Sequence, residues 1–273
     1  MFDPVSTYRI QFNKDFTFKD FVVIIPYLQE LGIKTVYASP IYEAAPGSMH
    51  GYDVVNPNLI NPEIGTIDEL RDISAKLKAA GMNWIQDIVP NHMGFHERNG
   101  WLMDVLENGE KSAYRSYFDL ISTDLEKEPL MVPFLGEDLE EVITKGELEL
   151  VEREGKRFLK YYDNHWPLRK DFPSADQDVR TVASNQYYRL CCHRETNKQI
   201  NYRRFFTVNS LICLNIQHSQ VFEDYHGFTK SLLEEGIFQG LRIDHVDGLA
   251  DPTMYLAQVR ELCGGGVYIV VGK

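Results

Sequence analysis

The sequence has few cysteines, no long apolar run and no secretory leader pattern, and each shortage excludes a class of protein. Its four cysteines, Cys191, Cys192, Cys213 and Cys263, lack metal-ligand spacing, so we expect reduced structural thiols. The longest apolar run, at residues 22–25, is far shorter than the roughly 20 residues that span a bilayer, which predicts no membrane segment. The opening MFDPVSTYR has neither the basic start nor the apolar stretch of a signal peptide, so a cytoplasmic location is expected.

The sequence also has fewer basic than acidic residues. The chain has 28 Lys and Arg against 40 Asp and Glu, a formal net charge of -12, and its cations are dispersed along the sequence. Such a surface repels a phosphate backbone, which excludes nucleic acid as an expected partner and favours a neutral ligand. With 273 residues and 44% hydrophobic residues, the chain can bury a core as one large domain or two small ones.

Strand and helix patterns alternate at both ends of the sequence. Strands are expected at residues 7–12, 35–38, 84–89, 240–244 and 267–271. Helices are expected from Phe18 to before Gly32, from Thr66 to before Gly81, around 228–237 and from Asp251 to the glycines at 264–266. This alternation predicts parallel βαβ units, in either a barrel or a doubly wound sheet.

The alternation stops after Gly94, which predicts an inserted subdomain. Residues 94–235 are too many for a βα loop, so three segments are expected: 1–93, 94–235 and 236–273. Within the insertion, residues 147–162 alternate apolar and polar side chains around Glu154-Gly155, which predicts a β-hairpin outside the parallel sheet.

Polar side chains follow the ends of the predicted strands. Ser39 follows the second, Asn91 and His92 the third, and Asp244 and His245 the fourth. The carboxyl ends of parallel strands meet at one edge, so a shared site is expected there. A histidine alone is more often structural than a ligand contact, and the position of His92 beside Asn91 moves that balance toward function.

Arg242 and Asp244 are two residues apart on a strand, so their side chains face the same way. A plain salt bridge is one interpretation. The other is that Arg242 keeps Asp244 ionised as a carboxylate nucleophile. Asp87, inside the third strand, is expected to be the buried partner of an arginine such as Arg242.

Three short motifs, HGYD at residues 50–53, DIVPNH at 87–92 and GLRIDH at 240–245, together resemble the alpha-amylase superfamily. The longer phrases TYRIQFNKDFTF, YASPIYEAAPGSMHGYDVVNP, NYRRFF and RIDHVDGLADP resemble the maltooligosyl trehalose synthase family within it, along essentially the whole chain. The resemblance implies an α/β fold, the N-terminal part of a (β/α)8 TIM barrel with about five of eight strands and a long subdomain inserted after the third strand.

The resemblance also implies an isomerase of carbohydrate metabolism. The reducing-end α-1,4 linkage of a maltooligosaccharide would be rearranged to α,α-1,1, as in trehalose biosynthesis, by a retaining mechanism with Asp244 as nucleophile. Tyr52 would stack on the sugar, and His92, Arg242 and His245 would contact its hydroxyls or Asp244. Asp53, Asp87 and Asn91 would be supporting residues. The expected partner is a maltooligosaccharide or other α-1,4-glucan, with no cofactor and no metal site.

The sequence departs from the family at Gly272, where the general acid/base glutamate is expected after the fifth strand. Glycine carries no acid, and the stabilising aspartate of the seventh strand is also missing, so we expect a fragment that is inactive alone. Three alternatives remain for the function: an α-glucan hydrolase, another transferase of the superfamily, or a noncatalytic glucan-binding remnant.

Overall fold

The computed structural model describes residues 3–173 and 177–272. They belong to two compact units, Met1–Met93 with Ile216–Lys273 and Gly94–Asn215. The second unit ends at Asn215, whereas the sequence analysis placed the end of the inserted segment at residue 235. The reason is helix α6 (Ser219–Glu234), which packs against β4 and α7 of the first unit.

Five parallel strands form the sheet of the first unit, in the order β1-β2-β5-β13-β14. They are β1 (Thr7–Ile10), β2 (Thr35–Ala38), β5 (Asn83–Ile88), β13 (Gly240–Ile243) and β14 (Tyr268–Val271). Strand order follows chain order throughout, whereas a doubly wound sheet reverses its order at a switch point. The arrangement is that of the N-terminal part of a (β/α)8 barrel, as the sequence predicted.

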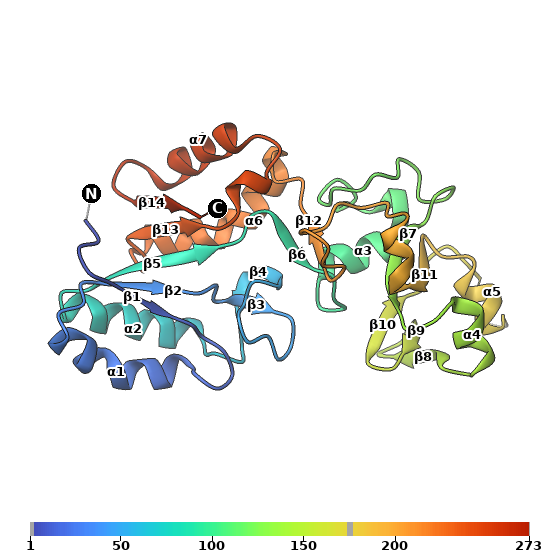
Figure 1. Cartoon of the computed structure of the whole chain (residues 1–273), viewed down its shortest axis with the longest axis horizontal. Helices are drawn as coiled ribbons and strands as arrows, with labels where there is room; N and C mark the ends of the chain where they lie inside the picture. Colours follow the sequence, from blue (N-terminus) through green and yellow to red (C-terminus); the bar gives the residue numbers. More distant parts are fainter. Residues whose placement is uncertain (1–2, 174–176, 273) are drawn as a thin grey trace. The chain divides into compact units, whose positions relative to one another are not determined.

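Four helices accompany this sheet: α1 (Phe18–Glu30), α2 (Ile67–Ala79), α6 and α7 (Pro252–Cys263). In Figure 1, α1 and α2 lie side by side next to β1 and β2. The expected capping interactions are confirmed at the start of three helices. Asp20 accepts from the Thr17 amide, Glu69 from the Thr66 amide, and Asp251 from the Met254 amide.

Aromatic rings fill the core of the first unit. Phe12 makes edge contacts with Phe18 and Phe21, and stacks on Trp84 with ring centroids 6.1 Å apart. All four rings are buried, and Trp84 also contacts Phe238. Burial of each ring contributes about 1.5–3 kcal/mol to the stability of the fold, so this cluster fixes α1 against the sheet.

An antiparallel hairpin joins β2 to α2 and was not predicted. It pairs β3 (Tyr42–Ala44) with β4 (Val54–Ile60), and residues 45–53 between them carry the HGYD motif. The 3-10 helix η3 (Val246–Gly248) follows β13, and β6 (His92–Gly94) leads from the first unit into the second.

The second unit is built from short elements. Its helices are α3 (Gly100–Asn108), η1 (Gly109–Lys111), α4 (Leu139–Thr144), α5 (Val179–Ala183) and η2 (His193–Asn197). Its strands are β7 (Leu130–Leu135), β8 (Leu148–Arg153), β9 (Lys156–Tyr161), β10 (Asn164–Pro167), β11 (Tyr188–Cys192) and β12 (Leu211–Cys213). The predicted hairpin around Glu154-Gly155 is confirmed as β8 and β9, which β10 extends to a three-stranded antiparallel sheet.

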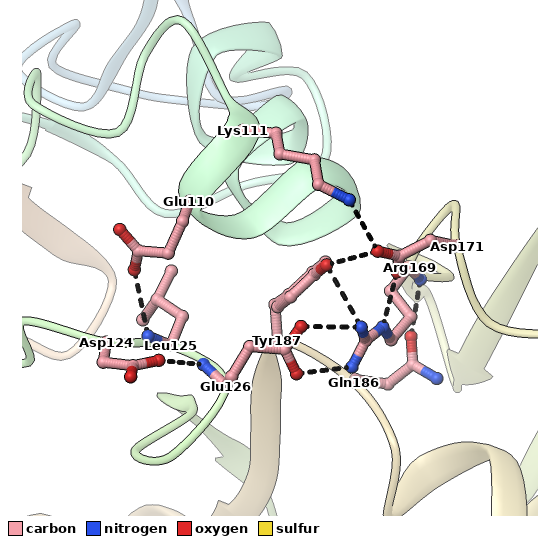
Figure 2. A network of polar contacts seen from close by, with 9 residues as sticks. All are labelled: Glu110, Lys111, Asp124, Leu125, Glu126, Arg169, Asp171, Gln186 and Tyr187. Carbon is pink, nitrogen blue, oxygen red and sulfur yellow. Dashed lines mark hydrogen bonds and ion pairs between the residues drawn. The ribbon is translucent and has the colours of Figure 1, made fainter.

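A polar network ties together three segments of the second unit (Figure 2). Arg169 pairs with Glu126 and with Asp171, and its guanidinium lies 4.0 Å from the centroid of the Tyr187 ring. The Tyr187 hydroxyl and Lys111 both donate to Asp171. Because these donors stabilise the carboxylate, the pKa of Asp171 lies well below its usual range.

All four cysteines are free thiols, and three of them are buried. Within residues 3–173 and 177–272, no helix is both long enough and apolar enough to cross a membrane.

Candidate active site

The expected site residues of the first unit meet at the carboxyl edge of its sheet. Asp87 and Arg242 are register partners on β5 and β13, and Arg242 is also the partner of Val270 on β14. The Asp244 amide donates to the Ile88 carbonyl, so the pairing of β5 with β13 continues to Asp244. The sheet therefore delivers Asp87, Arg242 and Asp244 to one edge, because they lie at the ends of adjacent strands.

Arg242 bridges two carboxylates. Its Nη1 lies 3.1 Å from Oδ1 of Asp87, and the same nitrogen pairs with Oδ1 of Asp244. The ion pair predicted between Asp87 and Arg242 is thus confirmed. Burial by itself would lower the pKa of Arg242, but the two carboxylates raise it above its usual range. Arg242 therefore stays charged and holds Asp244 in a fixed orientation.

Asp87 is fully buried and accepts from three side chains. The hydroxyls of Tyr37 and Tyr52 both donate to Oδ2 at 2.6 Å, while Arg242 lies 3.1 and 3.2 Å from the two oxygens. Burial raises the pKa of Asp87, and all three donors oppose that rise. Since every partner is a donor, the arrangement suits an ionised carboxylate that anchors the site.

His92 is buried and contacts the backbone of the HGYD loop. Its Nε2 lies 3.2 Å from the Tyr52 carbonyl, and its Nδ1 lies 3.4 Å from the Asn91 amide nitrogen. Burial lowers the pKa of His92 to about 4, so the ring is neutral at neutral pH. A neutral ring with its proton on Nε2 donates to Tyr52, which favours a positioning role for His92 in this structure.

The segment after Asp244 bends sharply. His245 adopts a left-handed backbone conformation with φ of 54°, and its Nδ1 lies 3.3 Å from Asp247. A side chain at Gly248 would place Cβ 2.4 Å from the His245 ring and 3.1 Å from Oδ1 of Asn91. A larger residue at 248 would therefore require the His245 ring to move.

The HGYD loop is shaped by its glycine and its aspartate. Gly51 has φ of 77°, and a Cβ there would lie 2.6 Å from the Pro40 carbonyl oxygen. Asp53 accepts from the Ser48 hydroxyl, and His50 Nδ1 lies 3.7 Å away. Asp53 therefore braces the loop that presents Tyr52.

Gly272 follows β14, where its amide donates to the Ile243 carbonyl at 2.8 Å. A Cβ built on Gly272 would lie 1.9 Å from Nη2 of Arg242. The Arg242 guanidinium thus fills the space where a larger side chain would begin. A residue with a side chain at 272 would require Arg242 to move, which its flexible stem permits.

Three outcomes at the site differ from the sequence reasoning. Ser39 is fully buried and accepts from the Phe12 amide at 3.0 Å, so it connects two strands and does not join the cluster. Tyr37 and Arg9 were missed. Arg9 is the register partner of Tyr37 and lies 3.5 Å from the Tyr52 hydroxyl. Alternation places both side chains on the face of Arg242, and that was the available signal.

Among the described residues, no group of three or more His, Cys, Asp or Glu could hold a metal ion. The cluster instead offers a carboxylate next to a guanidinium, a tyrosine ring and neutral imidazole, which suit a neutral polyhydroxylated ligand.

Comparisons with known proteins agree with this geometry. The family described as "Alpha amylase, catalytic domain" matches residues 21–261. A putative maltooligosyl trehalose synthase of Mycobacterium tuberculosis is 38% identical over all of this chain and 35% of its own length. The structure of maltooligosyltrehalose synthase from Arthrobacter ramosus superimposes with a TM-score of 0.90 at 36% identity, covering 98% of this chain and 34% of that one.

A more distant relative is a cyclomaltodextrinase of Geobacillus thermopakistaniensis, 29% identical over 60% of this chain and 27% of its own length. The chain spans about a third of the length of the synthases that it resembles. Since the family match extends over most of the sequence and the sheet carries its motifs at the expected strand ends, this chain belongs to the alpha-amylase family.

Proposed function

We propose that this chain is part of an enzyme that rearranges the reducing-end α-1,4 linkage of a maltooligosaccharide to α,α-1,1, with Asp244 as the nucleophile. The observation that carries the proposal is the position of Asp244. It lies at the carboxyl edge of the sheet beside Arg242, which is itself anchored on the buried Asp87. Similarity along the full chain to proteins named maltooligosyl trehalose synthases supports the choice of reaction.

The reaction would proceed in two displacements with retention. In the first, Asp244 forms a bond to the anomeric carbon as the bond to the leaving glucose oxygen breaks, and that oxygen takes up a proton. In the second, the anomeric hydroxyl of the retained glucose attacks the same carbon, loses its proton and displaces Asp244. Nothing is added or lost overall, so the enzyme would be an isomerase.

Binding roles follow from the same cluster. Tyr52 would offer its ring to the sugar at the cleavage point, while Arg242, His92 and His245 would contact sugar hydroxyls or Asp244. Asp53, Asp87 and Asn91 would support these contacts, as their hydrogen bonds within the cluster suggest.

The 273-residue chain would be inactive alone. The proton for the leaving oxygen requires a general acid, and Gly272 stands after β14, where the resemblance to the family implies a glutamate. Loss of such a group typically lowers the rate by a factor of about 10²–10⁴. Turnover of maltopentaose by the purified chain would contradict this part of the proposal.

Product analysis tests the reaction itself on the longest natural product of the gene. Formation of a trehalosyl end removes reducing power without shortening the glucan, whereas hydrolysis increases reducing power. The proposal predicts the first outcome and loss of it in Asp244→Asn. Gain of reducing ends would favour the second candidate, an α-glucan hydrolase, which the similarity to a cyclomaltodextrinase supports.

A noncatalytic glucan-binding protein is the third candidate, and Gly272 favours it. Binding of maltopentaose without any turnover by the natural product would identify it.

A further inference from the structure

The end of β1 reaches the loop that carries Tyr52. Gln11 donates from Nε2 to the Met49 carbonyl at 2.6 Å, and Asn13 lies 3.5 Å from the same oxygen. Arg9 donates from Nη1 to Oε1 of Gln11 at 2.8 Å, which orients the Gln11 amide toward the loop. Alternate residues of an extended segment share a face, so this row of side chains is a consequence of the strand.

Arg9 also reaches the tyrosines of the site. Its Nη2 lies 3.5 Å from the Tyr52 hydroxyl, and its guanidinium carbon lies 5.7 Å from the centroid of the Tyr37 ring. Both hydroxyls donate to Asp87 on the other side. The Tyr52 hydroxyl is therefore held between a cation on β1 and a carboxylate on β5.

Tyr52 is fixed at three points by different segments. Asp87 on β5 accepts its hydroxyl, His92 contacts its carbonyl, and Gln11, directly after β1, holds the preceding part of the loop through Met49. Without the contacts to Met49, the hydrogen bonds described for residues 48–51 would all lie within residues 45–53, such as that from the Gly51 amide to the Ser48 hydroxyl. Tyr52 would then be held at two points instead of three.

We propose that Arg9 and Gln11 are positioning residues of the candidate site, which hold loop 48–53 so that the Tyr52 ring stands ready to stack on an α-glucan. The choice of ligand rests on the proposed function, whereas the positioning itself does not. Stacking on a sugar depends on the angle and depth of the ring, so small displacements weaken binding.

A purely structural role is separable because Arg9 lies on an edge strand and is exposed. Arg9→Met removes the charge and the hydrogen bonds but keeps an unbranched apolar stem. Lys14→Met is the matched control, since Lys14 follows the same segment and pairs with Asp15 outside the loop.

The test places 3-fluorotyrosine at position 52 of the whole chain and records its ¹⁹F NMR signal without ligand. The unaltered chain and Lys14→Met should each give one narrow resonance at the same position. Arg9→Met and Gln11→Ala should shift or broaden it, and Arg9→Lys should restore it in part. Signals in Arg9→Met and Gln11→Ala that superimpose on that of the unaltered chain would overturn the proposal.

A second measurement separates this proposal from the proposed function. In a titration with maltoheptaose, Arg9→Met should weaken binding about fivefold, as the loss of one hydrogen bond allows. If the unaltered chain binds no maltoheptaose, the choice of ligand fails while the ¹⁹F spectra still decide the positioning role. Unchanged affinity in Arg9→Met, where the unaltered chain binds, would contradict the effect on stacking.

Discussion

The Tyr37 hydroxyl on β2 donates to Oδ2 of Asp87 on β5 at 2.6 Å. The same oxygen accepts from Tyr52, and Arg242 pairs with the carboxylate from β13. A single buried carboxylate thus connects strands β2, β5 and β13 with the HGYD loop. The stability of the site depends on Asp87 more than on the residues that would contact substrate.

Replacing Tyr37 by phenylalanine should destabilise the first unit by about 1.5–3 kcal/mol, because a hydrogen bond to a buried charged group is lost. Burial and Asp87 raise the pKa of Tyr37, so its proton remains on the hydroxyl at any working pH. Urea unfolding measures the change. Tyr8→Phe is the control on an exposed tyrosine of β1, and equal midpoints for the two variants would contradict the prediction.

Asp87→Asn should lower the free energy of unfolding by about 3 kcal/mol or more, because it leaves Arg242 partly buried beside an amide. This loss exceeds that expected for Tyr37→Phe. The measurement is the free energy of unfolding in urea at neutral pH. Asp68→Asn, on an 88% exposed side chain paired with Arg71, should change it by less than about 0.5 kcal/mol. Comparable losses in both variants would show that Asp87 is not the anchor described.

His226 makes the stability of the first unit depend on pH. It is fully buried on α6, with Nε2 2.9 Å from the Tyr255 hydroxyl, and burial lowers its pKa to about 4. Because the pKa of histidine in the unfolded chain is near 6.5, the unfolded state binds one more proton than the folded state between about pH 6.5 and 4. Stability should therefore fall as the pH decreases through that window, by about 1.4 kcal/mol per unit for this residue.

The measurement is the urea midpoint at several pH values, together with the NMR titration of the His226 ring. His226→Asn should reduce the slope and leave the part that is due to His92, whereas His50→Asn, on an exposed residue, should leave the slope unchanged. A His226 ring that titrates near 6.5 would refute the account.

The network of Figure 2 predicts that the stability of the second unit depends on pH in a different range. Arg169, Lys111 and Tyr187 lower the pKa of Asp171 in the folded state. The stabilisation of the folded state by the ionised Asp171 is therefore complete above the pKa of aspartate in the unfolded chain, which is near 3.9. It is lost as the pH falls below that value. Since 37% of the Asp171 side chain is exposed to solvent, Asp171→Asn should cost less than about 1 kcal/mol at neutral pH.

Limited proteolysis within residues 109–126 is the readout, because Arg169 and Lys111 connect that segment to Asp171. Cleavage should be faster in Asp171→Asn than in Asp163→Asn, whose exposed side chain lies outside the network. Equal rates would argue against a role for Asp171 in holding the segment.

Local signals explain which parts of the fold were predictable. Thr17 with Asp20 and Thr66 with Glu69 mark helix starts by chemistry that needs no tertiary contact, and Glu154-Gly155 marks the hairpin. The start of α6 at Ser219 was missed, since its buried face includes the polar residues His226 and Thr229. The short elements of the second unit depend on distant pairings, such as β7 with β11, that a local pattern does not encode.

The same distinction holds for the site. Asp87, Arg242 and Asp244 could be predicted because strand ends and two-residue spacing place them together. Alternation along the strands places Tyr37 and Arg9 on the same face as Arg242, but it does not identify their partners. Their contacts with Tyr52 and Asp87 join segments that are far apart in the sequence, so those contacts are known only from the structure.

The most direct test of the account follows maltopentaose by NMR in the presence of the purified 273-residue chain. Saturation transfer from protein to sugar, weakened in Tyr52→Ala and unchanged in Tyr8→Ala, is the predicted result, with the glucan unaltered after prolonged incubation. Absence of transfer would contradict the assignment of an α-glucan site. Conversion of the glucan would contradict the conclusion that Gly272 leaves Asp244 without the acid it needs.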